Sequence, residues 1–195
     1  PIPRTDPYWN SELPQIKYDP DKAKFHLRKS GLTSPPLVLQ CSDAAFSGAV
    51  DMAQLFQESA AKAGIRIDLK KEPADGFWDN VWLKGAFVTS YWAGRAAATQ
   101  MLAVAYAPDA PWNESHYKSE KFAMLLAEAR AETDEAKRKP MIWEMQSLLY
   151  HDGATIVPVF RDWLDAHNKN VGGHTPHGGF DMNNGGNVEQ AWLKA

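Results

Sequence analysis

Cysteine is nearly absent from the sequence, because Cys41 is the only one among 195 residues. A single cysteine excludes an intrachain disulfide. This content fits a reducing compartment, and it fits an exported protein that lacks disulfides equally well. The cysteine count therefore does not decide where the protein works.

Two further features are missing. No apolar run approaches the length of a helix that crosses a bilayer. Basic residues are not in excess either, since 21 Lys and Arg stand against 24 Asp and Glu, with a formal net charge of −3. Nucleic acid is disfavoured as a partner, because no basic stripe is present to neutralise phosphates.

The length and composition are those of a globular protein. A hydrophobic content of 44% with 23% charged residues is ordinary for a soluble domain. The length suits one good-sized domain, or one domain plus a piece of another. The chain starts at Pro1 rather than Met and shows no signal peptide, so we expect a processed or truncated piece of a longer protein.

What the sequence does contain is an aromatic run over residues 77–95. Five of these nineteen residues are Phe or Trp, and Tyr91 adds a sixth aromatic ring. Such side chains are costly to expose, so together they indicate a core or a pocket wall. The run ends at Arg95, whose guanidinium suits a carboxylate or phosphate in two-point geometry. The combination favours recognition of a ligand over chemistry upon one.

Helix and strand signals alternate through the first half of the chain. Asp19 followed by Pro20 predicts the start of a helix, and Gly31 predicts its end. The elements expected after it are a strand over residues 37–41, a helix over 49–63 ended by Gly64, a strand over 65–70, a short helix over 76–83 and a buried strand over 86–92.

The second half begins with two helices. The first is predicted over residues 119–132, and Thr133 or Asp134 caps the second. Pro140 lies inside this second pattern, so we expect it to kink the helix or to delay its start. The alternation of helices and strands along the chain predicts an α/β fold.

The end of the chain changes character. Residues 155–160 are predicted to form a strand, in which Pro158 indicates an edge or hinge position. Beyond Ala166, six glycines fall between Gly172 and Gly186, and large apolar residues are few. This tail cannot build a core of its own, so we expect it to pack against something outside this chain.

Several segments resemble one family in the same order along the chain. These segments are Tyr18–Lys24, Ala53–Ile67, Ala127–Arg138 and Ile156–Phe160. Each is weak alone, but together they extend over nearly all of the sequence. The chain resembles the C-terminal portion of the family 5 extracellular solute-binding proteins, which are the dipeptide, oligopeptide and nickel receptors of ABC transporters.

The resemblance implies a type II periplasmic-binding-protein-like fold, with a ligand trapped between two lobes. Residues 1–166 are then most of the second lobe, with a mixed sheet and flanking helices. Residues 167–195 cross the hinge and return to the first lobe, and the N-terminal lobes are missing from this chain. The family's role implies no cofactor. It implies a small-molecule or peptide ligand, an ABC permease and the missing N-terminal part of the same receptor as partners, in the periplasm or outside a membrane.

The resemblance also points to ligand-binding residues. Residues 92–95 match the family's W-x-x-D pattern, in which the acid holds the ammonium group of a peptide. Arg95 replaces that acid, so an anionic group on the ligand is expected instead. The alternative is that Arg95 pairs with an acid of the protein. The neighbouring site candidates are Tyr91, Trp92, Ala93 and Gly94.

Other aromatic residues fall into two classes. Trp112 and Asn113 lie in a Pro-flanked loop and are further pocket candidates, the alternative being a loop anchored by one buried indole. Phe77, Trp78 and Trp82 follow helical spacing, with the two indoles on one face, and core packing is the favoured interpretation.

Three competing interpretations remain. Asp75 and Asp79 near several Trp residues fit a carbohydrate hydrolase, although acids at a helix start more often stabilise its positive end. His167, His174 and His177 indicate a metal site only weakly. A purely structural interaction domain is the third, with the aromatic run fully packed.

Overall fold

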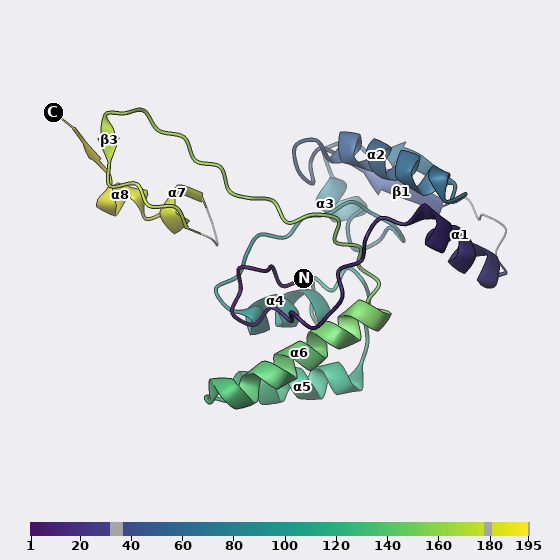
Figure 1. Ribbon diagram of the computed structural model, residues 1–195. Coiled ribbons are helices and arrows are strands. Elements are labelled where there is room, and N and C mark those ends of the chain that lie inside the picture. The colour runs from purple at the N-terminus through teal and green to yellow at the C-terminus, as the bar shows by residue number, and fades with distance from the viewer. Residues whose placement is uncertain (32–36, 178–180, 195) are drawn as a thin grey trace. The chain divides into compact units, whose positions relative to one another are not determined.

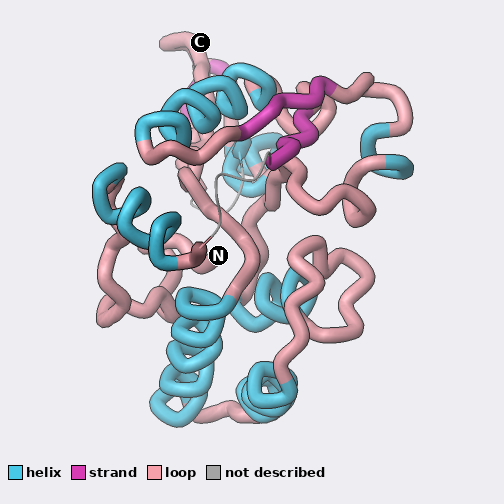
Figure 2. The backbone as a smooth tube through the Cα atoms, turned by 90° about the vertical axis from the view of Figure 1, so that its right-hand side faces the viewer, coloured by secondary structure: helices cyan, strands magenta, loops and turns pink. Residues whose placement is uncertain are grey.

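The computed structural model describes residues 1–31, 37–177 and 181–194, and Figures 1 and 2 show it in two views. The chain divides into a continuous unit, Gln15–Trp92, and a discontinuous unit, Pro1–Pro14 with Ala93–Ala195. Two of the six glycines counted in the tail, Gly178 and Gly179, lie outside the described residues.

A parallel β–α–β crossover forms the centre of the continuous unit. Strand β1 (Leu37–Cys41) pairs in parallel with β2 (Ile67–Lys71). Helix α2 (Ala49–Lys62) connects the strands and contacts both, as Figure 1 shows. On the other side of β1, one parallel bridge joins Gln40 to Val88. Figure 2 shows the two strands of this sheet in magenta, side by side.

The core of the continuous unit lies between this sheet and α2. Its buried members are Leu39, Cys41, Ala53 and Ile67. Phe56 and Phe87 pack against this cluster. Their two rings meet edge to face, with centroids 6.1 Å apart. A second cluster surrounds Phe77, which is 1% exposed, and includes Ala45, Ala49 and Val81. Both clusters use small residues of α2, which let the helix approach the layer below it.

The predicted helix start at Asp19 is confirmed. Helix α1 spans Pro20–Lys29, and the Asp19 carboxylate accepts a hydrogen bond from the Lys22 N–H at 2.8 Å. None of the α1 residues is buried. The short helix expected next to the aromatic run is a single turn, α3 (Phe77–Asn80).

Two strand predictions are wrong. Residues 86–92 pair with the sheet only at Val88, and residues 155–160 form no strand with any described part of the chain. A strand requires a partner for its backbone groups, which sequence pattern alone does not supply. Pro158 has no N–H to donate, and Ile156 and Val159 are each 62% exposed.

Three helices build the discontinuous unit, α4 (Ala98–Tyr106), α5 (Glu120–Ala131) and α6 (Glu135–Asp152). Helices α5 and α6 pack against each other, joined by the short turn at residues 132–134 (Figure 1). The buried side chains of these two helices include Phe122, Leu126, Ile142 and Met145.

Side-chain caps fix where α5 and α6 begin. Ser119 accepts from the Phe122 N–H at 3.2 Å, and Asp134 accepts from the Ala136 N–H at 2.9 Å. Of the two caps proposed for α6, Asp134 is therefore the correct one. The expected delay by Pro140 is wrong, since α6 begins at Glu135 and includes the proline.

Helix α4 was not predicted. Three of its nine residues are alanine, and its start at Ala97 has no side-chain cap. Its buried residues are Ala98, Met101, Leu102, Ala105 and Tyr106.

The tail forms a small structure of its own. Strands β3 (Val171–Gly172) and β4 (Trp192–Leu193) pair antiparallel, and the turns α7 (Asp181–Asn184) and α8 (Asn187–Gln190) lie between them in sequence. Gly173 has φ +79, and a Cβ there would overlap the Trp192 ring. Only Gly172 and Asn187 are buried among residues 167–177, 181–183 and 185–194, for which burial is described.

The first fourteen residues dock onto α6 through Gln146, which is 5% exposed. Its amide donates to the Tyr8 carbonyl at 2.7 Å and accepts from the Asn10 N–H at 3.1 Å. Asn10 in turn donates to the Trp143 carbonyl at 3.2 Å. Arg138 lies over the Tyr8 ring and donates to its hydroxyl at 2.8 Å. In the described part of the chain, no helix has the length and apolarity required to cross a membrane.

We expect Gln146→Leu to lower the free energy of unfolding by about 1–3 kcal/mol, because it leaves buried backbone groups of residues 8 and 10 without partners. The measurement is urea unfolding, with limited proteolysis to follow release of residues 1–14. Gln100→Leu, at an exposed position of α4, is the control and should change stability by at most about 0.5 kcal/mol. Equal effects of the two variants would show that the amide does not anchor the segment.

Candidate functional site

Trp78 is the centre of an aromatic cluster in the continuous unit. Its ring meets Phe77, Trp82 and Tyr91 edge to face, with centroids 5.3, 5.4 and 6.0 Å away. The Trp78 and Trp82 rings contact each other, but the predicted shared helix face is wrong, because α3 ends at Asn80 and Trp82 lies beyond it. The preference for core packing holds fully for Phe77 only, because Trp78 is 37% exposed and Trp82 is half-buried.

Tyr91 and Trp92 follow this cluster, at the end of the continuous unit. Tyr91 is 55% exposed, with one ring edge against Trp78, and Trp92 is half-buried. Neither belongs to a strand, although the sequence predicted one over residues 86–92. The cluster presents an aromatic surface of which Tyr91 is the most exposed ring.

Arg95 is held by its own loop. Its Nη1 donates to the carbonyl of Ala93 at 2.9 Å and to the carbonyl of Gly94 at 3.1 Å. The side chain is half-buried. Two backbone acceptors on adjacent residues fix the plane of the guanidinium, so part of the conformational entropy of this long side chain is already lost before any ligand arrives.

The loop between α4 and α5 contains Trp112 and Asn113. The Asn113 side chain is almost completely buried and donates to the carbonyls of Ala107 and Tyr117, at 3.2 and 2.8 Å. Its oxygen accepts from the Ser115 hydroxyl and the Tyr117 N–H, at 3.0 and 3.2 Å. These four bonds use the full capacity of the amide.

The alternative, a loop anchored by one buried indole, is therefore wrong. The amide of Asn113 is buried and the indole of Trp112 is 46% exposed. Asn113 acts on the loop conformation, and Trp112 is the residue that the loop presents to its surroundings.

A polar group that the sequence argument missed lies at the carboxyl ends of the parallel strands. The Gln40 amide donates to the Glu72 carboxylate at 2.7 Å, and the Lys70 ammonium lies 2.8 Å from the same oxygen. The hydrogen bonds from Lys70 and then Gln40 lower the pKa of Glu72 below its ordinary value of 4.5. Polar residues directly after a strand are the sequence signal that could have identified this group.

The acids proposed for a hydrolase are both exposed. Asp75 precedes α3, and Asp79 lies in its first turn, where a negative charge complements the helix dipole. Their positions fit the alternative to a hydrolase, in which acids at a helix start stabilise its positive end.

The histidines lie in the tail. His174 contacts Asn187 through Nδ1 at 3.1 Å, its Nε2 lies 3.7 Å from the Asp165 carboxylate, and its ring is 5.2 Å from that of His167. Across the described ranges, no three His, Cys, Asp or Glu side chains converge in a geometry that suits a metal ion.

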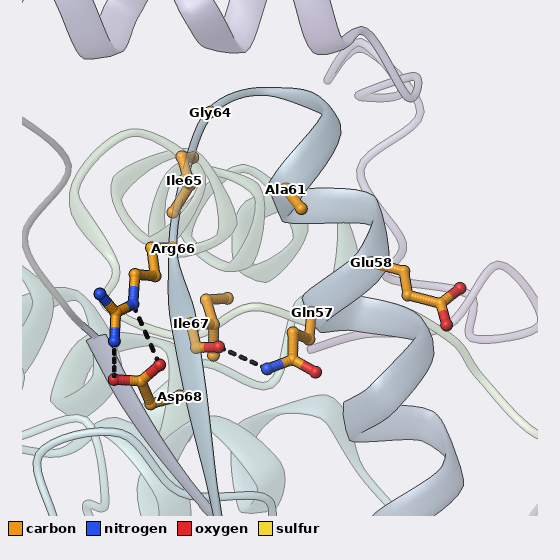
Figure 3. Close-up of a pocket in the computed structure, with 8 residues that line it drawn as sticks. All are labelled: Gln57, Glu58, Ala61, Gly64, Ile65, Arg66, Ile67 and Asp68. Carbon is orange, nitrogen blue, oxygen red and sulfur yellow. Dashed lines mark hydrogen bonds and ion pairs between the residues drawn. The ribbon is translucent and has the colours of Figure 1, made fainter.

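A hollow of about 520 Å³ lies at the side of α2 and β2, as Figure 3 shows. Arg66 forms a two-point ion pair with Asp68 there, both bonds being 3.2 Å, and the Gln57 amide binds the Ile67 carbonyl at the open edge of β2. Glu58 points away from the others in this view. None of the site residues predicted from the sequence lines this hollow.

Comparison with known proteins connects these features to one group. A sequence profile described as bacterial extracellular solute-binding proteins, family 5 middle, matches residues 1–107. No curated protein sequence matches the chain. Among solved structures, a similar one is the ABC transporter-associated periplasmic binding protein DppA from Helicobacter pylori, in complex with the peptide STSA. It is 20% identical with a TM-score of 0.76, and the match covers 99% of this chain and 38% of that one.

Two further solved structures are similar. HbpA2 from Haemophilus parasuis is 20% identical with a TM-score of 0.71, over 96% of this chain and 38% of that one. NikA from Staphylococcus aureus, in complex with Ni(L-His)2, is 24% identical with a TM-score of 0.61, over 76% and 32%. The chain thus spans less than two fifths of the length of these proteins. The likeness confirms the expected α/β fold of the type II periplasmic-binding-protein kind.

The Glu72 interactions predict a pH dependence of stability. Because the pKa of Glu72 is lower in the folded state than in the unfolded chain, its contribution is present above the unfolded pKa and is lost as pH falls below about 4.5. Glu72→Gln should therefore be less stable than the unsubstituted protein at pH 7, and the difference should shrink as pH falls below about 4.5. Thermal unfolding from pH 3 to 7 measures this, with the exposed Glu58→Gln as the control. A difference that stays constant over the range would contradict it.

We expect Asn113→Ala to lower the free energy of unfolding by about 2–3 kcal/mol, because buried partners at Ala107 and Tyr117 lose their hydrogen bonds. Ser115→Ala removes only one of the four bonds and should cost about 1 kcal/mol or less. Urea unfolding of both variants tests the assignment. If Asn113→Ala is no more destabilising than Ser115→Ala, the amide does not organise the loop.

Proposed function

Because the chain belongs to the bacterial extracellular solute-binding proteins of family 5, we propose that it is part of the substrate-binding component of an ABC importer. This component captures a small polar solute between two lobes and delivers it to the membrane permease, from the periplasm or the outer surface of a membrane. The observation that carries the proposal is the profile match over residues 1–107. The peptide in the H. pylori relative supports a peptide or peptide-like ligand.

The proposal divides the chain between the lobes. Residues 1–166 belong to one lobe, and residues 167–195 cross the hinge and enter the other. The small number of buried residues in the tail supports this division, because exposed side chains such as Leu193, at 80%, need a surface to cover them. The N-terminal part of the same receptor supplies that surface and completes the pocket.

Arg95 is the proposed anchor for an anionic group of the ligand. Lobe closure removes the ligand from water, so each charge on it needs a fixed partner of opposite charge. A guanidinium is always charged and meets a carboxylate or phosphate in a planar fork. The carbonyls of Ala93 and Gly94 hold it in place, which lowers the entropy that binding costs.

Aromatic residues are proposed as further ligand contacts. Tyr91, Trp92 and Trp112 all keep part of their rings accessible, and such rings give large contact areas at little entropic cost. Asn113 contributes by holding the Trp112 loop in shape. Ala93 and Gly94 carry little or no side chain, which lets a ligand approach the backbone beside Arg95.

We propose no catalytic role for this chain. The family is one of solute-binding proteins, and the acids of the competing hydrolase, Asp75 and Asp79, are exposed at a helix start. A receptor binds its ligand in a fixed ratio, is stabilised by it and releases no product.

The test uses the complete receptor and two probes, the tetrapeptide Ser-Thr-Ser-Ala and its N-succinyl derivative, which carries a carboxylate where the first has an ammonium group. We expect tighter binding of the succinyl peptide, and Arg95→Ala should weaken it by about 10- to 100-fold, because hydrogen bonds to a charged group are lost. Isothermal calorimetry gives the affinities. Native mass spectrometry of the unsubstituted receptor weighs any ligand retained from the cell.

Arg66→Ala is the matched control, since it removes an exposed arginine whose partner is Asp68. Unchanged affinity in Arg95→Ala would exclude the anchor and leave the receptor assignment standing. A receptor that retains no ligand and binds neither probe would contradict the assignment itself.

A further inference from the structure

The path of the chain through the parallel sheet reverses at β1. From β1 the chain crosses through α2 to β2 on one side, and it then returns to pair with Gln40 on the other side at Val88. The two connections leave β1 in opposite directions. In open α/β sheets, ligands bind outside the carboxyl ends of the strands at such a point.

Residues with hydroxyl side chains lie at the carboxyl ends of these strands. Ser42 directly follows β1, and Thr89 and Ser90 directly follow the bridge at Val88. The Thr89 N–H donates to the Gln40 carbonyl at 3.0 Å, so its backbone is fixed to β1. The Ser42 hydroxyl accepts from the Ala44 N–H at 3.3 Å and thus serves the turn after β1.

The hydroxyls of Thr89 and Ser90 differ from that of Ser42 in their hydrogen bonding. Thr89 is 5% exposed, and both oxygens are buried without a hydrogen-bond partner in the part of the chain that the structure describes. A buried polar group without a partner is costly, and such groups in native proteins call for an explanation. Two adjacent ones at the ligand-binding end of a sheet indicate that their partner comes from outside the described part of this chain.

We propose that the hydroxyls of Thr89 and Ser90 bind an uncharged polar group of the ligand, namely a peptide group or a hydroxyl. The proposal rests on the receptor function above and assigns to these residues a contact separate from the one assigned to Arg95. A hydroxyl both donates and accepts, which matches the N–H and C=O of a peptide group. An uncharged group suits these residues better than a charged one, because a buried charge needs a charged partner and neither hydroxyl carries a charge.

Of the two residues, Ser90 is the more accessible. Ser90 as a residue is only half-buried, although its oxygen is covered. A ligand group that enters here is shielded from water by the same surroundings, which strengthens its hydrogen bonds.

The experiment separates a ligand contact from a structural one. Thr89→Val keeps the shape of the side chain and removes the hydroxyl, and Ser90→Ala removes the neighbouring hydroxyl. In the complete receptor without ligand, we expect both variants to unfold at the same temperature as the unsubstituted protein or at a higher one, because they delete an unpartnered buried group. Affinity for N-succinyl-Ser-Thr-Ser-Ala should fall about 5- to 10-fold for each variant.

Two controls accompany these variants. Thr89→Ser keeps the hydroxyl and loses the methyl group, so it should recover affinity relative to Thr89→Val while lowering the unfolding temperature. Ser119→Ala removes the hydroxyl that caps α5, so it should lower the unfolding temperature and leave affinity unchanged.

The opposite pattern would overturn the proposal. A lower unfolding temperature with unchanged affinity in Thr89→Val and Ser90→Ala would show that the hydroxyls have a structural partner, such as a buried water. If Arg95→Ala loses affinity in the same series and these variants do not, the receptor function stands and this contact alone is excluded. If the unsubstituted receptor binds neither probe, the receptor function fails first.

Discussion

The pairing of Gln40 with both of its neighbours is the constraint on which the continuous unit depends. Its backbone accepts from the Thr89 N–H and donates to the Phe87 carbonyl, each at 3.0 Å, while β1 pairs with β2 on the other side. Its side chain binds Glu72. Gly85 lies so close that a Cβ there would overlap the Gln40 amide. One residue thereby aligns the carboxyl ends of three chain segments, and the position of everything from Thr89 to Trp92 follows from it.

Where the sequence predicted structure well, the signal was local. The start of α1 at Asp19, the strand over residues 37–41 and the helix that ends before Gly64 depend on groups a few residues apart. Capping side chains and left-handed glycines act over that range. Helix α4 escaped prediction because it has no cap, and its alanines give no contrast between a buried and an exposed face. Residues 155–160 failed because a strand depends on a partner elsewhere.

For the candidate site, too, the sequence shows some properties and not others. The segment at residues 91–95 and the loop at residues 112–113 could be proposed from the sequence, since aromatic and charged residue types are visible without coordinates. It did not tell which way the side chains face. Asn113 is buried and Trp112 exposed, the reverse of what size and polarity suggest, because a saturated amide is easily buried whereas a partnerless one is not. The hydroxyls of Thr89 and Ser90 were missed, because absence of a partner is a tertiary property.

The anchoring of the first fourteen residues by α6 has a consequence for synthesis. Asn10 and Gln146 are 136 residues apart, whereas Leu37 and Ile67, which pair in the β1–β2 ladder, are only 30 apart. At ribosomal speeds, the wait between making Asn10 and making Gln146 is on the order of ten seconds. The β1–β2 ladder has all of its members long before that, so the order of events on the ribosome runs from the middle of this chain outwards. Residues 1–14 are therefore among the last parts of this chain to find their place.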